Sequence, residues 1–485
     1  MSNSLREACS DSRVAVVRLP SFNYEGESEN GDPIAAALMR LGRELEWADP
    51  DRGPLANVIP RGARVVVKPN FVNHANQGSG GILPLVTHQS LVHKSVEAAL
   101  QAGAGKVLVG DAPIQSCDFE LLLKVMNLDS WSETLAKKDQ RFKGIHDFRR
   151  TKSVIHNGVR VAAENLQSED NFVLFDLAAF SLLEAVTDEH ESFRVTSYDP
   201  SLMAKTHSRG RHQYLVSRHL MEADVVINLP KLKTHKKAGV TCALKNLIGI
   251  NGNKEYLPHH RLGGTDAGGD CYPGGNPIKR ALEFSFDRQN STESLFAAKV
   301  WQTVGQQINR VLSLTGDVLG IEGSWHGNNT IWRTCLDLNR ILLYGRADAT
   351  MADEPQRRVI HIVDAVVAGQ GDGPLSPQPL ELSLIFAGQN AAAVDWVGSR
   401  LLGYDPNRIP IVREAFGEFK WPLTRFTHND LSLKGDLGEG GVELLESARV
   451  SADIIYPVGW ADAVDGSADS ARTVVSNTRE TEEAA

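Results

Sequence analysis

Residues 223–254 read ADVVINLPKLKTHKKAGVTCALKNLIGINGNK, and the expected fold is built outward from this stretch. Val225–Leu229 is a short, mostly apolar run, as in a strand that is buried on both faces of a parallel sheet. Pro230 predicts the end of that strand, because proline has no N–H to donate to a neighbouring strand. No acidic residue occurs between Asp224 and Glu255, although the whole chain has a formal net charge of -9. Positive charge is therefore concentrated directly behind a predicted buried strand.

The lysines lead from this strand into a predicted short helix. Gly239 opens a segment in which Val240, Leu244 and Leu247 recur at helical spacing, and Gly249 is placed to end it. We therefore predict a strand, a lysine-rich loop and a short helix. The N-terminus of a helix has unpaired N–H groups and a partial positive charge, which attract an anion. The stretch predicts an anion site, and a solvated basic surface without a ligand is the alternative.

The composition limits the class of protein. With 485 residues, 42% hydrophobic and 23% charged, the chain has the composition of a globular protein with room for two or three lobes. No apolar run approaches the roughly 18 residues that span a bilayer, and the polar start lacks the apolar core of a signal peptide. The 5 cysteines are scattered without a CxxC pair, which argues against disulfides, zinc or an iron–sulfur cluster.

From these features we expect a cytoplasmic protein that has no membrane partner. Its net negative charge argues against general nucleic-acid binding, although one basic patch could still contact a phosphate. Association into a homo-oligomer stays open.

Short apolar runs alternate with stretches of helical periodicity along the chain. The alternation predicts an α/β fold, with a mostly parallel sheet, flanking helices and two lobes joined through a long insertion. We expect a flexible N-terminus over residues 1–12, an α/β core over 13–113 and 224–455, an insertion or second lobe over 114–223, and a disordered tail over 459–485.

Ligands of parallel α/β sheets collect outside the carboxyl ends of the strands. The predicted strands Arg64–Asn70 and Lys106–Pro113 end in Lys68, Asn70 and Asp111. We expect these side chains to meet the lysine-rich stretch in one anion-binding pocket. The expected substrate-binding residues there are Lys68, Asn70, Lys231, Thr234 and Asn246.

Three residues of the stretch are the expected catalytic groups: Lys233, His235 and Lys245. His235 is the predicted proton shuttle, since the unperturbed pKa of histidine is about 6.5. Clustered lysines lower one another's pKa, so one of them could act as a neutral base or nucleophile.

Two further segments supply candidates for substrate binding. Arg358–Pro374 predicts a strand followed by a glycine-rich loop, in which Gly371 and Gly373 would let the backbone approach a ligand closely. Trp325 and Arg333 stand in a crowded polar segment that suits a sugar or a nucleobase. A capped amphipathic helix explains the same residues equally well.

Aspartates near the predicted strand ends are candidate metal ligands. Asp111 and Asp372 offer the oxygen donors that Mg²⁺ prefers. An isolated aspartate in a turn is the alternative for Asp372, and a plain strand end is the alternative for Asp111. Mg²⁺ is therefore an expected cofactor, whereas no iron–sulfur cluster is expected.

Five blocks of the sequence occur together in a known family. They are VVVKPNFV at Val65–Val72, AGAGKVLVGDAP at Ala102–Pro113, the segment Ala223–Gly249, IVDAVVAGQGDGPLS at Ile362–Ser376 and AGQNAAAVDWVGSRLLGYDP at Ala387–Pro406. In these blocks the chain resembles the family catalogued as domain of unknown function 362. Some members of that family carry a ferredoxin-like cysteine cluster. This chain lacks those cysteines, so the resemblance implies the variant without the cluster.

Three functions follow as hypotheses. The first is an enzyme that acts on a small anionic metabolite with a phosphate, a nucleotide or a carboxylate group, by group transfer or ligation. The second is a non-catalytic accessory protein that binds a small molecule or a cofactor at the same residues. The third is a redox accessory protein, by analogy with the cluster-bearing relatives.

Overall fold

The computed structural model describes residues 9–21, 23–24, 32–156, 159–188, 192–196, 198–441 and 453–464. The described parts of the two expected disordered ends are packed against the protein. Cys9 is buried, with its Sγ 3.7 Å from the hydroxyl of Tyr344. Val458–Ala463 forms the short helix η10, and its Trp460 is buried. The expectation of disorder is therefore corrected for these residues, and the rest of both ends lies outside the described residues.

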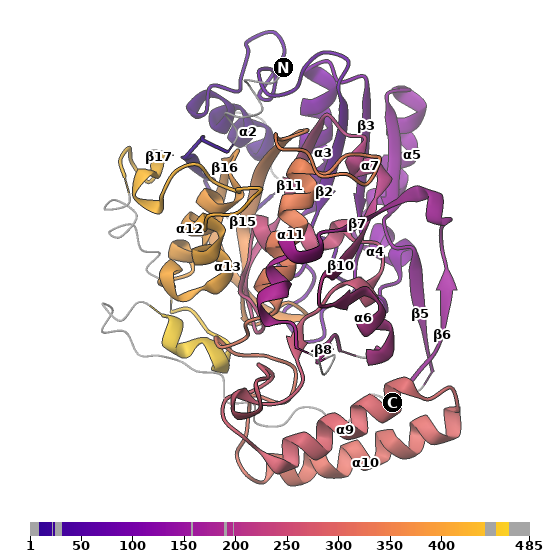
Figure 1. Cartoon of the computed structure of the whole chain (residues 1–485). Helices are drawn as coiled ribbons and strands as arrows, with labels where there is room; N and C mark the ends of the chain where they lie inside the picture. Colours follow the sequence, from indigo (N-terminus) through magenta and orange to yellow (C-terminus); the bar gives the residue numbers. More distant parts are fainter. Residues whose placement is uncertain are drawn as a thin grey trace.

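In the described part of the chain, a ten-stranded sheet forms the centre of the molecule (Figure 1). The main order is β17-β1-β16-β15-β11-β2-β3-β4, and β12 with β13 adjoins β15. The strands are β1 Arg13–Arg18, β2 Arg64–Pro69, β3 Lys106–Asp111, β4 Phe142–Asp147, β11 Val225–Leu229, β12 Lys231–His235, β13 Gly239–Thr241, β15 Arg358–Asp372, β16 Ser376–Gly388 and β17 Ser432–Gly435.

The sheet is mostly parallel, as predicted. Neighbouring strands are parallel from β15 through β11, β2 and β3 to β4, and also in the pairs β1–β17 and β12–β15. The pairs β1–β16, β15–β16 and β12–β13 are antiparallel. The carboxyl ends of β2, β3 and β11 consequently lie at one edge of the sheet.

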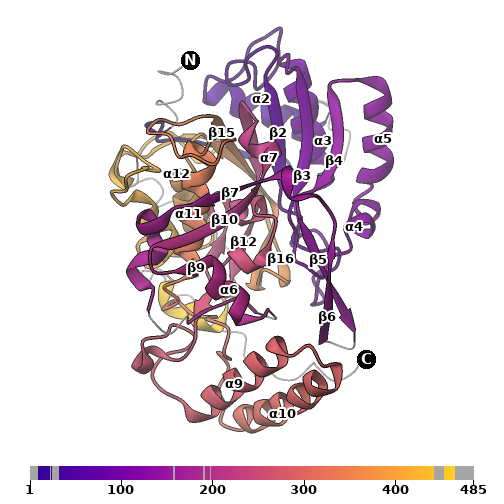
Figure 2. The same ribbon diagram turned by 45° about the vertical axis from the view of Figure 1, so that its right-hand side comes forward.

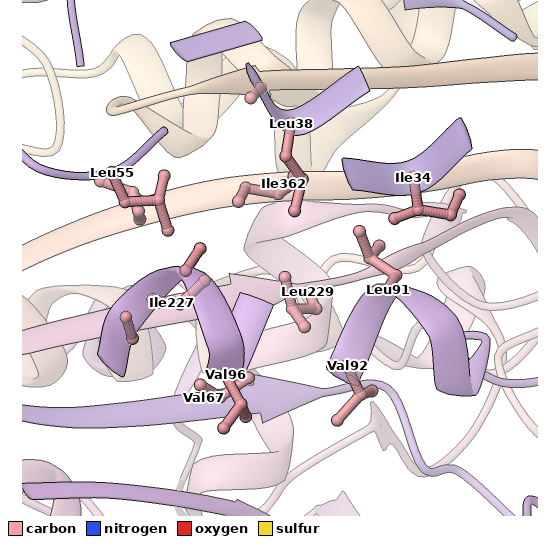
Figure 3. Packing of buried hydrophobic residues seen from close by; sticks show 14 of the residues in the cluster. Ile34, Leu38, Leu55, Val67, Leu91, Val92, Val96, Ile227, Leu229 and Ile362 are labelled. Carbon is pink, nitrogen blue, oxygen red and sulfur yellow. The ribbon is translucent and has the colours of Figure 1, made fainter. Parts of the chain in front are cut away.

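Helices cover both faces of the sheet. On one face, α2 (Pro33–Glu44) and α3 (Gln89–Gln101) pack Ile34, Leu91 and their neighbours against Val67 and other strand residues (Figure 3). On the other face lie α8 (Ala243–Asn246), α11 (Ile331–Tyr344) and α12 (Ala391–Leu401). Val66 points to a separate cluster from Val67, as the two-residue repeat of a strand requires. The α/β class is therefore confirmed.

Residues 114–223, the expected insertion or second lobe, are built into the main body. Its strand β4 extends the central sheet beside β3. Its helices and strands are α4 Phe119–Val125, α5 Leu128–Lys138, β5 Thr151–His156, β6 Val159–Asn165, β7 Phe172–Asp176, β8 Phe193–Arg194, α6 Pro200–Thr206, β9 His207–Ser208, β10 Arg211–Ser217 and α7 Arg218–Met221. The small sheet β7-β10-β9 shares a hydrophobic cluster with Val66 and Leu108 of the central sheet.

A helical hairpin of α9 (Pro277–Ser291) and α10 (Leu295–Ser313) extends away from the sheet (Figures 1 and 2). Further short elements are β14 His260–Arg261, η4 Leu247–Ile250, η5 Lys254–Tyr256 and α13 Pro410–Arg413. Within the described ranges, no helix has both the length and the apolar character that crossing a membrane demands.

The lysine-rich stretch is a strand, not the predicted loop. Pro230 does end β11, but β12 begins at the next residue and pairs with β15. Its sequence KLKTH alternates, so Lys231, Lys233 and His235 share one side of the strand. Gly239, at a φ of 80°, then starts β13 rather than a helix. The helix begins later, as α8, and continues as η4.

Candidate functional site

Lys68 and Asp111 meet at the ends of adjacent parallel strands. Lys68 Nζ lies 2.7 Å from Asp111 Oδ1, and both side chains are almost completely buried. The other carboxylate oxygen of Asp111 accepts the backbone N–H of Phe71 at 2.7 Å. Burial lowers the pKa of Lys68, and the charge of Asp111 opposes that effect. Asp111 therefore serves primarily as the counter-charge of Lys68.

The segment α8–η4 lies across these strand ends. Asn246 Oδ1 accepts hydrogen bonds from Lys68 Nζ at 3.2 Å and from Asn70 Nδ2 at 2.9 Å. A Cβ atom added to Gly249 would stand 2.0 Å from Asp111 Oδ1. Only a glycine lets the backbone pass this close to the ion pair. The structure thus brings together the strand-end residues and the helix that the sequence analysis assigned to one site.

Lys231 and Lys233 have partners within the protein. Lys231 Nζ forms an ion pair with Asp364 at 2.7 Å. Lys233 Nζ donates to Asn70 Oδ1 at 2.9 Å and to the carbonyl of Leu85 at 2.6 Å. Neither lysine is exposed at all. Lys233 has no carboxylate partner in the described part of the chain, and burial, followed by the charge of Lys231, lowers its pKa well below the ordinary value.

Lys245 is a buried cation of the site that has no partner among the described residues. Its side chain is 7% exposed, and no described residue forms a hydrogen bond or an ion pair with it. Burial lowers its pKa, the nearby thiol of Cys335 raises it, and the charge of Lys68 lowers it further. Burial also lowers the pKa of Lys254 to about 8, against the attraction of Asp111. A buried cation without a counter-charge is costly, so an anion would stabilise this arrangement.

We refer to Lys68, Lys233, Lys237, Lys245 and Lys254 together as the lysine cluster. A small cavity of about 20 Å³, partly open to solvent, lies beside it rather than within it. Leu247 and His361 line this cavity. His361 Nδ1 accepts a hydrogen bond from Asn228, whose Oδ1 accepts one from Asn246.

His235 is held in one tautomer by its own turn. Its Nδ1 lies 3.0 Å from the backbone N of Lys237 and 3.1 Å from that of Ala238, and it accepts both N–H groups. The proton of the neutral ring is therefore on Nε2. Burial, followed by the charges of Lys245 and Lys233, lowers the pKa of His235 well below its ordinary value. These contacts correct the predicted role of proton shuttle, because Nδ1 cannot accept a proton while it faces two N–H donors.

His259 is a site residue that sequence reasoning did not select. Its Nδ1 lies 2.7 Å from the carbonyl oxygen of Leu257, so Nδ1 carries the proton and donates it. The lone pair of the neutral ring is then on Nε2. Burial, followed by the charges of Lys237 and Lys245, lowers the pKa of His259 well below its ordinary value. The adjacent histidines His259 and His260 were the only hint in the sequence. No spacing rule relates them to Lys233–His235.

The N-terminus of α8 is occupied by the protein itself. Asp395 of α12 accepts the backbone N–H of Ala243 at 2.6 Å and that of Leu244 at 3.2 Å. Burial raises the pKa of Asp395 to about 7, while these hydrogen bonds lower it. The prediction that this helix end holds an external anion is therefore wrong.

Thr234, Gly371 and Gly373 hold β12 against the end of β15. The hydroxyl of Thr234 donates to the carbonyl of Gly371 at 2.7 Å. A Cβ atom on Gly373 would lie 2.0 Å from the carbonyl oxygen of Thr234. The predicted glycine-rich loop is thus largely strand, and its close backbone approach is to β12 rather than to a ligand.

Trp325 and Arg333 belong to a different network, at the start of α11. Trp325 Nε1 donates to the carbonyl of Asp270 at 2.9 Å, and Arg333 Nε donates to the carbonyl of Asn329 at 2.9 Å. Asn328 Oδ1 accepts the N–H of Thr330 at 3.0 Å and that of Ile331 at 3.1 Å, just ahead of the first turn of the helix. The capped-helix alternative accounts for these residues, and the structure does not bring them to the lysine cluster.

Asp111 and Asp372 do not form one metal site. The register aligns Val109 of β3 with Ile360 of β15 through β2 and β11. Asp111 lies two residues beyond that row, whereas Asp372 lies twelve residues beyond it and three strands away. Among the described residues, no three His, Cys, Asp or Glu side chains gather as metal ligands. The two aspartates therefore cannot bind one metal ion together.

The fold and this site define an α/β protein with a buried lysine- and histidine-rich cluster at the ends of parallel strands. Residues 178–400 match the family model described as Domain of unknown function (DUF362). The match includes Lys233–His235 (KTH) and Asp395, and it confirms the predicted family. The two N-terminal blocks that contain Lys68 and Asp111 precede the matched residues.

Several known proteins are similar to this chain. A thylakoid-associated protein of Synechocystis is 26% identical over 398 residues, which cover 82% of this chain and 77% of that protein. A crystal structure of a Thermotoga maritima protein has 11% identity and a TM-score of 0.28, with 76% of this chain and 57% of that one covered. The lactate racemase apoprotein of Thermoanaerobacterium thermosaccharolyticum has 11% identity and a TM-score of 0.30, with 82% and 58% covered. This chain spans less than two thirds of either solved chain.

Proposed function

We propose that the lysine cluster binds a small anionic metabolite, with a phosphate or a carboxylate group, and that the protein is an enzyme acting on it. The observation that carries the proposal is Lys245, which is 7% exposed and has no partner among the described residues. Lys254, whose pKa is lowered to about 8 by burial, adds a second cation near it. The charges of Lys68 and Lys245 act on one another and on Lys254, so one anion could neutralise several of them.

The proposal narrows the set of binding residues. Lys68, Lys231 and Lys233 keep their internal partners and position the strands. Lys245, Lys254 and the two histidines have capacity left for a ligand. No Mg²⁺ site is part of the proposal, because Asp111 is committed to Lys68.

Calorimetric titration with inorganic phosphate, pyrophosphate and citrate, with chloride at matched ionic strength, tests the binding. We expect saturable binding in the wild type and at least a tenfold weaker affinity in Lys245→Met. The matched control is Lys138→Met, an exposed lysine of α5, which should bind as the wild type does. At 100 times its dissociation constant, a true ligand adds about 2.7 kcal/mol to the free energy of unfolding.

Three results would change the proposal. Equal affinity of Lys245→Met and the wild type would remove Lys245 from the site. Binding without turnover of any phosphorylated or carboxylate compound would favour the non-catalytic accessory protein. Iron in the purified protein would favour the redox accessory protein. We retain the cytoplasm as the proposed location, and cell fractionation tests it, because the Synechocystis relative is named for its association with thylakoids.

A further inference from the structure

We propose that the lysine cluster is a proton-transfer site, in which His259 Nε2 accepts the proton and His235 Nε2–H donates a fixed hydrogen bond. The substrate class is an anion that carries an acidic C–H bond next to a carbonyl group. The inference rests on the proposed function, since the anion must first be held by Lys245 and its neighbours.

The hydrogen bonds of the two rings set opposite tautomers. His235 uses Nδ1 to accept the N–H groups of Lys237 and Ala238, so its Nε2 carries a proton. His259 uses Nδ1–H to donate to Leu257, so its Nε2 has a free lone pair. Neither Nε2 atom has a hydrogen-bond partner in the described part of the chain. The site therefore presents one donor and one acceptor whose roles cannot be exchanged.

Both histidine rings lie near the same lysine side chains. His235 has Lys245, Lys233, Lys237 and His259 as its charged neighbours. His259 has Lys237 of the β12–β13 turn, Lys245 of α8 and Lys254 of η5 as its neighbours. An anion held between Lys245 and Lys237 would consequently be close to both histidines.

The acidic groups nearby are already engaged. Glu322 lies 3.7 Å from Lys237 Nζ and 3.6 Å from Lys236 Nζ, and the charge of Lys237 lowers the pKa of Glu322 to about 2. Asp111 is paired with Lys68. Both carboxylates are therefore ion-paired with lysines, and neither is available as a competing base.

The step balances without a co-reactant. The C–H bond next to the carbonyl group breaks, and its proton moves to His259 Nε2. The electron pair of that bond forms a C=C bond, and the negative charge moves to the carbonyl oxygen. His235 Nε2–H and Lys245 stabilise that oxygen, as a neutral imidazole donor and a cation can do in a site that excludes water. Return of the proton from His259 to carbon restores a carbonyl compound.

Anion binding should also change the charge of His259. Three lysines around an empty site disfavour the imidazolium, whereas a bound anion favours it. Near neutral pH, binding should therefore be coupled to the uptake of a proton by His259. His235 cannot take up that proton, because its Nδ1 faces two N–H groups.

Two matched variants separate the two roles. In His235→Asn the amide oxygen can still accept the N–H groups of the turn, and in His259→Asn the amide N–H can still donate to Leu257. Each variant thus keeps the hydrogen bond that supports the fold and loses Nε2. His235→Gln restores an N–H donor near the position of Nε2.

Two measurements test the proposal. The first is calorimetry with inorganic phosphate at pH 7 in buffers of different ionisation enthalpy, which counts the protons taken up. Phosphate and the lysines contribute the same proton exchange in every variant, so the difference between variants reports on His259. We expect equal uptake in the wild type and in His235→Asn, and a smaller uptake in His259→Asn. The second is NMR of pyruvate and dihydroxyacetone phosphate in D₂O, which follows exchange of carbon-bound hydrogen.

We expect the rate of hydrogen exchange to be about 10²–10⁴-fold lower in His259→Asn than in the wild type, which is the usual contribution of a general base. A rate about 10²–10³-fold lower in His235→Asn, and partly recovered in His235→Gln, would identify His235 as the donor that stabilises the carbonyl oxygen. Equal proton uptake in His259→Asn and the wild type, or a rate of hydrogen exchange unaffected in His259→Asn, would overturn the inference and leave the proposed anion site intact. Absence of exchange on both probes in the wild type would also overturn it. If phosphate, pyrophosphate and citrate all fail to bind, the proposed function falls as well.

Discussion

Lys68 and Asp111 form a 2.7 Å ion pair across the carboxyl ends of β2 and β3, and Lys68 has no exposed surface. The two residues are 43 positions apart in the sequence, and the parallel pairing of their strands brings them together. The ion pair lies directly under Gly249, where α8–η4 crosses the sheet edge. The pair thus holds Lys68 of the lysine cluster directly beneath η4.

Removing the charge of Asp111 should destabilise the protein strongly. Asp111→Asn leaves Lys68 buried without a counter-charge, which typically costs about 3–5 kcal/mol in the free energy of unfolding. Urea denaturation at pH 7 measures the change. The control is Glu97→Gln, which breaks an exposed pair with Lys94 and should cost less than about 1 kcal/mol. Similar midpoints for both variants would show that the buried pair contributes no more than a surface pair.

Adding one methyl group at Gly249 should also destabilise the fold. In Gly249→Ala the new Cβ would stand 2.0 Å from Asp111 Oδ1 and 2.8 Å from Lys68 Nζ. Overpacking of this kind costs about 1–3 kcal/mol, and thermal unfolding measures it. Gly78→Ala is the control, because its Cβ would meet nothing closer than 3.4 Å. An unchanged melting temperature of Gly249→Ala would mean that the chain can move away from the ion pair.

Asp395 should make stability depend on pH. Burial raises its pKa to about 7 in the folded protein, against about 3.9 in the unfolded chain. Between these values the folded state holds the proton and the unfolded state does not, so the free energy of unfolding falls as pH rises. The slope from this group is about 1.4 kcal/mol per pH unit.

The variant Asp395→Asn removes that titration and can still accept the N–H groups of Ala243 and Leu244. The advantage of the wild type over the variant should therefore shrink between about pH 4 and pH 7 and stay constant above it. Urea denaturation at pH 5, 6, 7 and 8 measures the difference. A difference that does not change with pH would contradict the raised pKa.

The hydroxyl of Tyr24 should stabilise the second buried ion pair. It donates to Asp364 Oδ1 at 2.6 Å and accepts from Lys231 Nζ at 2.9 Å. Tyr24→Phe leaves both groups with an unmet hydrogen bond, at a cost of about 1–3 kcal/mol in the free energy of unfolding. Tyr256→Phe is the control, since its hydroxyl bonds to none of the described residues. Equal stability of the two variants would show that other groups satisfy Asp364 and Lys231.

Much of the architecture could be predicted from local patterns. The apolar run at Val225–Leu229 and the proline after it did define β11. The strand that ends in Lys68 pairs with β11, and the strand that ends in Asp111 is the next one along the sheet. The alternation of KLKTH is present in the sequence, although the sequence analysis predicts a loop for this segment. A two-residue repeat of lysines looks exposed, whereas β12 buries them against partners from distant segments.

The roles of individual site residues required the tertiary structure. The carboxylate that caps α8 comes from Asp395, 152 residues after Ala243. The tautomers of His235 and His259 depend on backbone groups whose positions follow from turns, and no spacing rule encodes them.

By itself, the sequence determined the α/β class, the parallel strands and the concentration of lysine behind β11, because periodicity and charge are properties of neighbouring residues. The tertiary structure alone decided which lysines are neutralised and which histidine can accept a proton. That outcome depends on burial and on partners that lie far away along the chain, and only the packed fold brings those partners within hydrogen-bond distance.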